Sequence, residues 1–459
     1  MSSSALHMRP EDIDNIEKRG KYTVAIIGCK ETGILHACLF LRAGFGVVCA
    51  DPDQTITSNL ARGKASFLRR EIELDLKKHL KTGRLSSTND IKKATSQSDI
   101  IAITSPARID KKKKVDYSSV ENACRQAGSA LRRGSVIIIM TATGVGMIEG
   151  SIKGTLENAS GFKAGIDFGL AFSPFQIWGE IGLENITNRE RIVAAVDKAS
   201  LDVASTVLQT VSKNSVRKTT NVKLTEAATL FDATQRDVDV ALVSELALFC
   251  EKVGVDYLEA RRLMDANSDP KTGLRAFAYE NLQEEPYSLL EDAENLNLKL
   301  RIASAARETN EEMAKHAVNL TKDALRSCGK TMRRARISLL GISREPNTRS
   351  PPRRIAKELA AILEARGARV GLYDPYLLGN EPTEMQRHFH KSLTEAVEGK
   401  DCLLILAEHE QLRHLNLKKL KVVMKMPAAI VDLVGIIEPD NVEKEGFIYR
   451  GFGRGVWTK

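Results

Sequence analysis

One pattern occurs twice in this sequence: an apolar run that ends in glycine, a helix-length stretch, and a second apolar run followed by Asp-Pro. The first copy contains residues 23–28 and 47–52, and the second contains residues 337–341 and 370–375. In a parallel sheet, this order of strand, glycine turn, helix and strand places backbone N–H groups and a helix N-terminus where a phosphate can bind. The two copies therefore predict two nucleotide-sized sites, one near each end of the chain.

The chain is long enough for more than one domain, because 459 residues exceed what a single hydrophobic core usually supports. Apolar runs alternate with helix-length stretches across residues 21–213 and again across residues 331–459, while residues 214–330 have a helical pattern. We predict an α/β protein with two Rossmann-like, doubly wound domains joined by a long central helix. Residues 1–20 are expected to form a flexible N-terminal tail.

The formal net charge of +9 has two interpretations. The basic side chains are spread along the chain, as on a solvated surface, but their excess could also draw dinucleotides and nucleoside diphosphates into a cleft. Nucleic-acid binding would need basic residues interleaved with aromatic residues on one face, and aromatic residues make up only 5% of the chain. We therefore expect no nucleic-acid partner.

The seven cysteines form no CxxC pair and no metal-ligand spacing with histidine, so we expect reduced thiols and no metal site. His409 and His414, which follow an apolar run, are interpreted as surface histidines rather than ligands. The longest apolar runs are too short to cross a membrane, and residues 1–8 lack the features of a signal peptide. We expect a cytoplasmic protein with no membrane association.

A dinucleotide-binding loop is predicted at the first glycine turn, which reads Gly-Cys-Lys-Glu-Thr-Gly. The usual fingerprint has a second glycine where this chain has Lys30. Lys30 could crowd a pyrophosphate or pair with it, and the sequence leaves both open. The candidate cofactor-binding residues of this region are Gly28, Lys30, Glu31, Thr32, Gly33 and Asp51.

Asp51 follows the second strand of the first copy. A carboxylate at this place would accept hydrogen bonds from the adenine ribose and disfavour a 2′-phosphate, so the expected cofactor is NAD rather than NADP. The alternative is that Asp51 only begins a turn with Pro52.

A long amphipathic helix is predicted to begin near residue 222, because no proline or glycine interrupts the pattern before Gly254. Its apolar side chains recur at helical spacings: Leu224, Ala227, Phe231, Val238, Leu242, Leu246, Phe249 and Val253. A connecting helix of this kind can form a homodimer interface, although a helix buried between two domains would show the same pattern.

Several segments, spread along nearly the whole chain, occur in an order and at spacings that are typical of one protein family. They lie at 231–238 and 241–256 in the predicted central helix, at 307–310 (Arg-Glu-Thr-Asn) in the next helix, at 345–348, 367–370 and 373–376, and at 449–455. Together these segments resemble the nucleotide-sugar dehydrogenase family, which includes the UDP-glucose and UDP-N-acetylmannosamine dehydrogenases.

This resemblance implies an NAD-binding domain over residues 21–213, a central helical dimerisation domain over 214–330 and a domain that binds a UDP-sugar over 331–459. Members of the family use two NAD to oxidise the sugar 6-hydroxyl to a carboxylate, in the synthesis of polysaccharide or glycan precursors. An active-site cysteine captures the intermediate aldehyde, because a thiolate is nucleophilic near neutral pH and forms a hydrolysable thioester.

The chain departs from the family where the cysteine is expected. Its Glu285-Pro286-Tyr287 matches the Asp-Pro-Tyr segment of the family, and counting back places Asn281 in the position of the cysteine. No cysteine occurs between Cys250 and Cys328, so a small shift in the alignment does not restore one.

Three other family positions are also replaced. The lysine and asparagine of the central helix fall on Thr229 and Ala233, and the glutamate of a Ser-Pro-Glu segment falls on Phe175. Thr143 matches the family, which implies both a catalytic and a cofactor-binding role for it. The candidate catalytic residues are Thr143, Glu285 and, in place of the cysteine, Asn281.

Two functions remain open from the sequence. The first is an NAD-dependent nucleotide-sugar dehydrogenase that acts on a UDP-sugar, and the alternative is a catalytically impaired relative that binds NAD or a nucleotide sugar as a regulatory or partner subunit. Glu226 lies one turn before Thr229 and could act as a general base only if burial raised its pKa.

Overall fold

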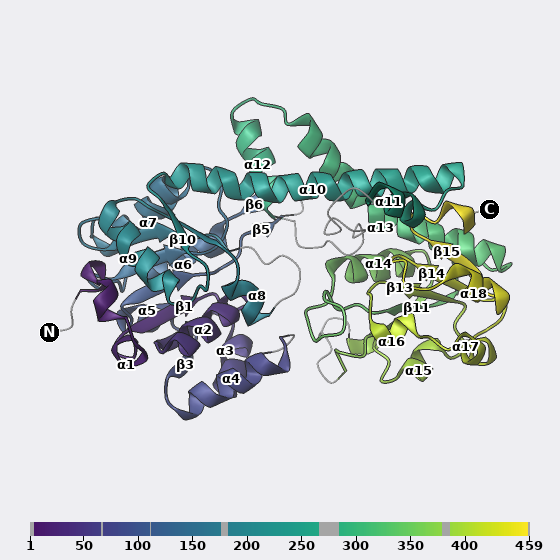
Figure 1. Cartoon of the computed structure of the whole chain (residues 1–459), viewed down its shortest axis with the longest axis horizontal. Helices are drawn as coiled ribbons and strands as arrows, with labels where there is room; N and C mark the ends of the chain where they lie inside the picture. The colour runs from purple at the N-terminus through teal and green to yellow at the C-terminus, as the bar shows by residue number, and fades with distance from the viewer. Residues whose placement is uncertain are drawn as a thin grey trace. The chain divides into compact units, whose positions relative to one another are not determined.

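The computed structural model describes residues 4–65, 68–110, 112–175, 182–265, 284–378 and 386–457. The chain forms two compact units, which are drawn in Figure 1. The first unit contains residues 1–234 and 283–300, and the second contains residues 235–282 and 301–459. None of the helices in the described residues is both long and apolar enough to span a membrane.

The first unit is built on an eight-stranded sheet with the order β10-β9-β8-β7-β4-β1-β2-β3. All neighbours are parallel except β8 and β9. The central strands are continuous apolar runs rich in isoleucine and valine, as expected where both faces of a sheet are covered. The strands are β1 (Thr23–Ile27), β2 (Gly46–Ala50), β3 (Leu85–Thr88), β4 (Ile100–Ile103), β7 (Val136–Ile139), β8 (Gly169–Phe172), β9 (Arg191–Ala195) and β10 (Val216–Thr219). A separate antiparallel pair is formed by β5 (Arg108–Ile109) and β6 (Val115–Asp116).

Helices cover both faces of this sheet, and each face has its own buried apolar cluster. The cluster on one face includes side chains from α2 (Glu31–Ala43), α3 (Gln54–Ala61), α4 (Arg70–Lys81) and α9 (Lys198–Gln209). The cluster on the other includes side chains from α5 (Ile91–Ser96), α6 (Ser118–Gly128) and α7 (Lys153–Ser160). The unit also contains α1 (Ile16–Arg19), α8 (Leu183–Thr187), α12 (Glu284–Asn295) and the first part of α10 (Val222–Val253).

Residues 4–20 differ from the expected flexible tail. Ala5, Leu6 and Met8 are buried, and the Leu6 N–H donates a hydrogen bond to the carbonyl of Gly134. The segment packs on the first unit because these apolar side chains can be removed from water there.

The second unit contains a five-stranded parallel sheet with the order β12-β11-β13-β14-β15. Figure 1 shows α13 and α14 on one side of this sheet and α15 to α18 on the other, so the predicted architecture of two doubly wound sheets is confirmed. The strands are β11 (Arg336–Leu340), β12 (Arg369–Tyr373), β13 (Cys402–Ile405), β14 (Ala429–Asp432) and β15 (Ile448–Gly451). The helices are α11 (Tyr257–Asp265), α13 (Arg301–Ser327), α14 (Arg354–Ala365), α15 (Leu393–Val397), α16 (Glu410–Arg413), α17 (Leu417–Val423) and α18 (Pro439–Lys444).

The predicted long helix is present as α10 (Val222–Val253). Residues 214–330 do not form a compact unit of their own, because α12 packs with the first unit while α13 packs with the second sheet. Contacts between residues that are far apart in the sequence determine this division, and the local helical pattern of the sequence does not reveal these contacts.

Candidate functional site

The first glycine turn lies where the strand order of the first sheet reverses, between β1 and β4. Ligands of doubly wound sheets bind at this place, outside the carboxyl ends of the strands. Gly28 has a φ of +93°, and a Cβ there would lie 2.6 Å from the Ser105 nitrogen. A Cβ on Gly33 would lie 2.1 Å from the Gly28 carbonyl oxygen. The tight turn and the close approach of α2 to β1 therefore both require glycine.

Lys30 occupies the position of the missing glycine without backbone strain. Its φ of −77° is ordinary for any residue, it precedes the first residue of α2, and its side chain is exposed. Glu31 and Thr32 form the first turn of α2 and are partly exposed. The first N–H groups of a helix have no partner within the helix and favour an anion, which fits the pyrophosphate of a dinucleotide.

Asp51 is 5% exposed and fixes the turn through both carboxylate oxygens. Its Oδ2 accepts a hydrogen bond from the Cys29 N–H at 2.7 Å, and its Oδ1 accepts one from the Asp53 N–H at 3.0 Å. Asp51 therefore has the role in the turn that was the alternative to ribose binding. Each oxygen keeps a further lone pair, so the carboxylate can still accept a hydrogen bond from a ribose hydroxyl.

A loop after β7 is held by the buried carboxylate of Glu226, near the start of α10. Glu226 accepts hydrogen bonds from the Thr143 hydroxyl at 3.2 Å, from the Gly146 N–H at 2.6 Å and from the Ile148 N–H at 2.8 Å. Burial raises the pKa of Glu226, although these three hydrogen bonds act in the opposite direction. In this structure Glu226 thus anchors the loop that carries Thr143.

The same loop is also held by α12. Asp292 accepts a hydrogen bond from the Val145 N–H at 2.8 Å, and burial raises the pKa of this carboxyl group. The hydroxyl groups of Tyr117 and Ser288 are 2.7 Å apart, which attaches α12 to the start of α6. Glu285 is partly buried in the first turn of α12, and Asn281 lies outside the described residues.

Three residues that the family resemblance places at catalytic positions, Thr229, Ala233 and Phe175, make contacts within the fold. The Thr229 hydroxyl donates a hydrogen bond to the Thr225 carbonyl of its own helix at 2.8 Å, and Ala233 is fully buried. Phe175 packs against His36 with ring centroids 4.9 Å apart, and its ring lies 4.9 Å from the guanidinium carbon of Arg191. None of these three residues can transfer a proton to a substrate.

His36 and Arg191 form a buried pair that the sequence analysis did not identify. The His36 Nδ1 donates a hydrogen bond to the Thr32 carbonyl at 2.8 Å, which leaves Nε2 free to accept one from Arg191 at 3.2 Å. Burial, and then the positive charge of Arg191, lower the pKa of His36 to about 3, so the imidazole is neutral near pH 7.

The second glycine turn repeats the arrangement of the first. Gly341 has a φ of +75°, and Asp374 accepts hydrogen bonds from the Ser343 N–H at 2.7 Å and the Tyr376 N–H at 2.9 Å. It lies between β11 and β13, where the order of the second sheet reverses. Asp374 is fully buried, so its carboxylate supports the turn and does not face a ligand.

His409 is also fully buried at this turn, which corrects its interpretation as a surface histidine. Its Nδ1 accepts a hydrogen bond from the Asn347 N–H at 2.9 Å, so the ring proton is on Nε2, which lies 3.1 Å from Asp374. Burial alone would raise the pKa of Asp374, but hydrogen bonds from His409 and from the Ser343 and Tyr376 N–H groups hold it below its usual value. His414 is exposed and contacts Glu410, as expected for a surface residue.

Comparison with known proteins identifies the family. Models of the UDP-glucose/GDP-mannose dehydrogenase family match at residues 22–212 for the NAD binding domain, 223–312 for the central domain and 338–439 for the UDP binding domain. The chain belongs to the UDP-glucose/GDP-mannose dehydrogenase family. The predicted family function, an NAD-dependent oxidation of UDP-sugars, and the predicted cofactor NAD are thereby confirmed.

Two relatives show how far the similarity extends. The chain is 29% identical over 441 residues to the UDP-N-acetyl-D-mannosamine dehydrogenase of Pyrococcus horikoshii, which covers 94% of this chain and 99% of the relative. A solved structure of that type of enzyme from the same organism has a TM-score of 0.81 and covers 95% of this chain and 100% of its own. The NDP-N-acetyl-D-galactosaminuronic acid dehydrogenase of Methanosarcina mazei has a TM-score of 0.75 at 26% identity, and all of both chains is covered.

Proposed function

We propose that the substrate of this family member is a UDP-N-acetylhexosamine, oxidised at the sugar 6-hydroxyl with NAD in the first unit. The observation that carries the proposal is the repeated glycine turn, fixed by Asp51 in one sheet and by Asp374 in the other at each reversal of strand order. The similarity to dehydrogenases of N-acetylated sugars supports the substrate class. NAD, when bound, accepts the hydride, and the residues of the first unit bind and orient it.

The test of this proposal is NADH formation, followed by absorbance, with UDP-N-acetylmannosamine, UDP-N-acetylgalactosamine and UDP-glucose. We expect higher kcat/KM for the two N-acetylated sugars than for UDP-glucose. Equal or higher kcat/KM for UDP-glucose would contradict the proposed substrate class.

A second candidate function is a subunit that binds NAD and a UDP-sugar without turnover. It is favoured by Thr229, Ala233 and Phe175, which stand at family positions for catalysis and whose side chains are engaged within the fold or too small to act. Binding of both ligands in calorimetry without NADH formation would support this function, and turnover to a uronic acid would exclude it.

A third possible outcome of the NADH assay is a single oxidation of each sugar, which stops at the aldehyde. Because Asn281 cannot form a thioester, the chain would release an aldehyde and form one NADH for each sugar. Trapping of the aldehyde together with the NADH yield distinguishes this outcome from the complete oxidation. Glu285, which is partly buried, is the remaining candidate for a contact with the reacting sugar, because Thr143 is fully buried and its hydroxyl is bonded to Glu226.

We also propose that the chain forms a homodimer through α10. Large apolar side chains on one stripe of this helix are exposed, including Phe231 (58%), Leu242 (54%) and Phe249 (63%). The spacings between them are multiples of the helical repeat, so they share one face. An exposed apolar stripe of this length favours association with a second copy.

A further inference from the structure

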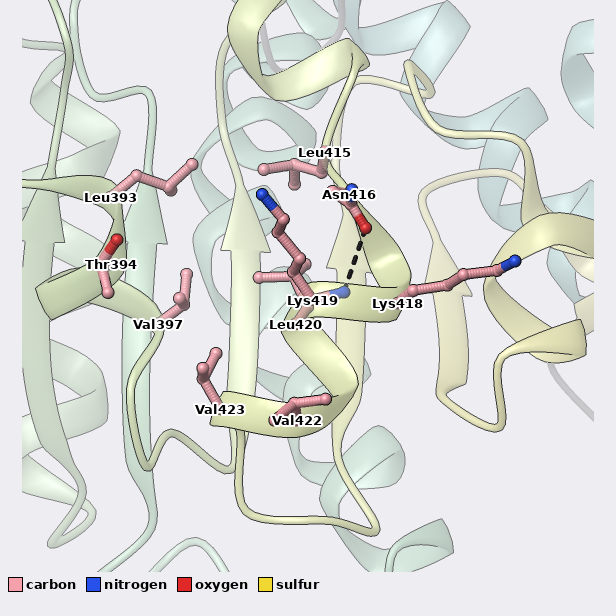
Figure 2. A pocket seen from close by; sticks show the side chains of 10 residues that line it. All are labelled: Leu393, Thr394, Val397, Leu415, Asn416, Lys418, Lys419, Leu420, Val422 and Val423. Carbon is pink, nitrogen blue, oxygen red and sulfur yellow. Dashed lines mark hydrogen bonds between the residues drawn. The ribbon is translucent and has the colours of Figure 1, made fainter.

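A groove of about 550 Å³ lies between α15 and α17 in the second unit. Figure 2 shows its two walls, one formed by Leu393 and Val397 and the other by Leu415, Leu420 and Val423. Its volume is in the range of pockets that hold small molecules. The residues of the second glycine turn do not line it, so the groove is separate from the site at the strand ends.

Two lysines, Lys418 and Lys419, are among the residues that line this apolar groove. Figure 2 shows the ammonium of Lys419 between Leu393 and Leu415, whereas the side chain of the adjacent Lys418 extends away from the groove. The Lys419 N–H donates a hydrogen bond to the Asn416 side chain at 3.0 Å, which fixes the first turn of α17. Within the described residues, no carboxylate pairs with the Lys419 ammonium.

The size of the groove favours a small molecule over a protein segment as its ligand. Ten residues line it, whereas a stable protein interface uses roughly 20–30 residues on each side. Apolar walls with lysine ammonium groups at the rim are complementary to a molecule that has an apolar body and a negatively charged head group.

We propose that this groove binds a free amphipathic carboxylate, with its hydrocarbon chain along the apolar walls and its carboxylate on Lys419. The hydrocarbon chain accounts for most of the binding free energy, because it is transferred from water to the apolar walls. The ammonium selects the anionic head group. The proposal does not depend on the reaction of the NAD-binding unit.

The test is a calorimetric titration of the full chain with dodecanoate below its micellar concentration. We expect saturable binding by the wild type, weakened about tenfold or more in Lys419→Glu and changed less than about twofold in Lys418→Glu. The two variants have the same change in net charge at adjacent positions of α17 and differ in the direction of the side chain, since only the Lys419 ammonium lies between Leu393 and Leu415 (Figure 2). Leu415→Ser should also weaken binding, while thermal unfolding shows that each variant is folded.

Four results would overturn the proposal. The first is no saturable binding of dodecanoate by the wild type, and the second is an equal loss of affinity in the two lysine variants. The third is equal affinity for dodecyltrimethylammonium, which has the same chain and the opposite charge. Binding to anionic vesicles without binding of free dodecanoate would also contradict it, since it would assign the lysines to a lipid surface.

Discussion

Glu226 anchors the loop after β7, and this role follows from its place on α10. It lies on the same face of the helix as the buried Val222 and Leu230, at spacings of one turn in each direction. An acidic residue at the helical spacing of buried apolar residues is expected to be buried as well, but the sequence does not reveal its partners. Those partners, the Thr143 hydroxyl and two backbone N–H groups, are more than 70 residues away along the chain.

Glu226→Gln should destabilise the first unit. The new amide NH₂ group would face a backbone N–H of the loop, so one buried donor would lose its acceptor at a cost of about 1–3 kcal/mol. Thermal unfolding should show a lower melting temperature, while Glu149→Gln, the same change at an exposed position, should have almost no effect. An unchanged melting temperature with lost turnover would instead support a role for Glu226 as a general base.

His36 should make the stability of the first unit depend on pH. Its pKa is about 3 in the folded chain, and an unfolded histidine has a pKa of about 6.5, so between these values the unfolded chain binds the extra proton. Stability is therefore lost as the pH falls through this window, by up to roughly 3 kcal/mol at pH 4. Urea unfolding of the wild type and of His36→Gln at several pH values measures this contribution.

The exposed His414 provides the control for this experiment. His414→Gln should keep the pH dependence of the wild type, and His36→Gln should reduce it. The same pH dependence in all three proteins would show that His36 is not the residue responsible.

At the scale of the element, α10 shows why an apolar periodicity can indicate the exposed face. The large apolar residues predicted from the sequence, such as Leu242 and Phe249, are exposed, while the opposite face is buried through small and polar side chains such as Ala233, Asp237 and Ser244. The sequence predicts the helix and its two faces from spacing alone. It does not predict which face packs, because Asp237 is buried by contacts with Arg307 and Asn310 of another helix.

A charge on the apolar stripe of α10 should disrupt the proposed dimer. Phe249→Glu would place a carboxylate in the apolar contact near the C-terminal end of α10, and light scattering at micromolar concentration should give the mass of a monomer. Ile166→Glu is the matched control, since Ile166 is 76% exposed in the first unit and is not part of α10. A stable wild-type monomer at the same concentration would contradict the proposed dimer.

At the scale of the whole molecule, the duplicated pattern accounts for both sheets. Each glycine turn lies at a reversal of strand order, so the sequence could predict the two doubly wound sheets and the NAD-binding domain. It could not predict that α12 joins the first unit, because that depends on contacts of Asp292 and Ser288 with distant segments. The contacts of Phe175 with His36 and Arg191 and the burial of His409 were missed for the same reason.

The central claim is that the first glycine turn binds NAD through Asp51, and calorimetric titration with NAD tests it most directly. We expect the wild type to bind NAD and Asp51→Asn to bind it at least about tenfold more weakly, since hydrogen bonds to a charged acceptor contribute about 1.5–3 kcal/mol. Asp53→Asn has the same change in charge two residues away, and asparagine caps α3 as well as aspartate does, so its affinity should stay within about twofold of the wild type. No NAD binding by the wild type, or equal affinities in all three proteins, would contradict the claim.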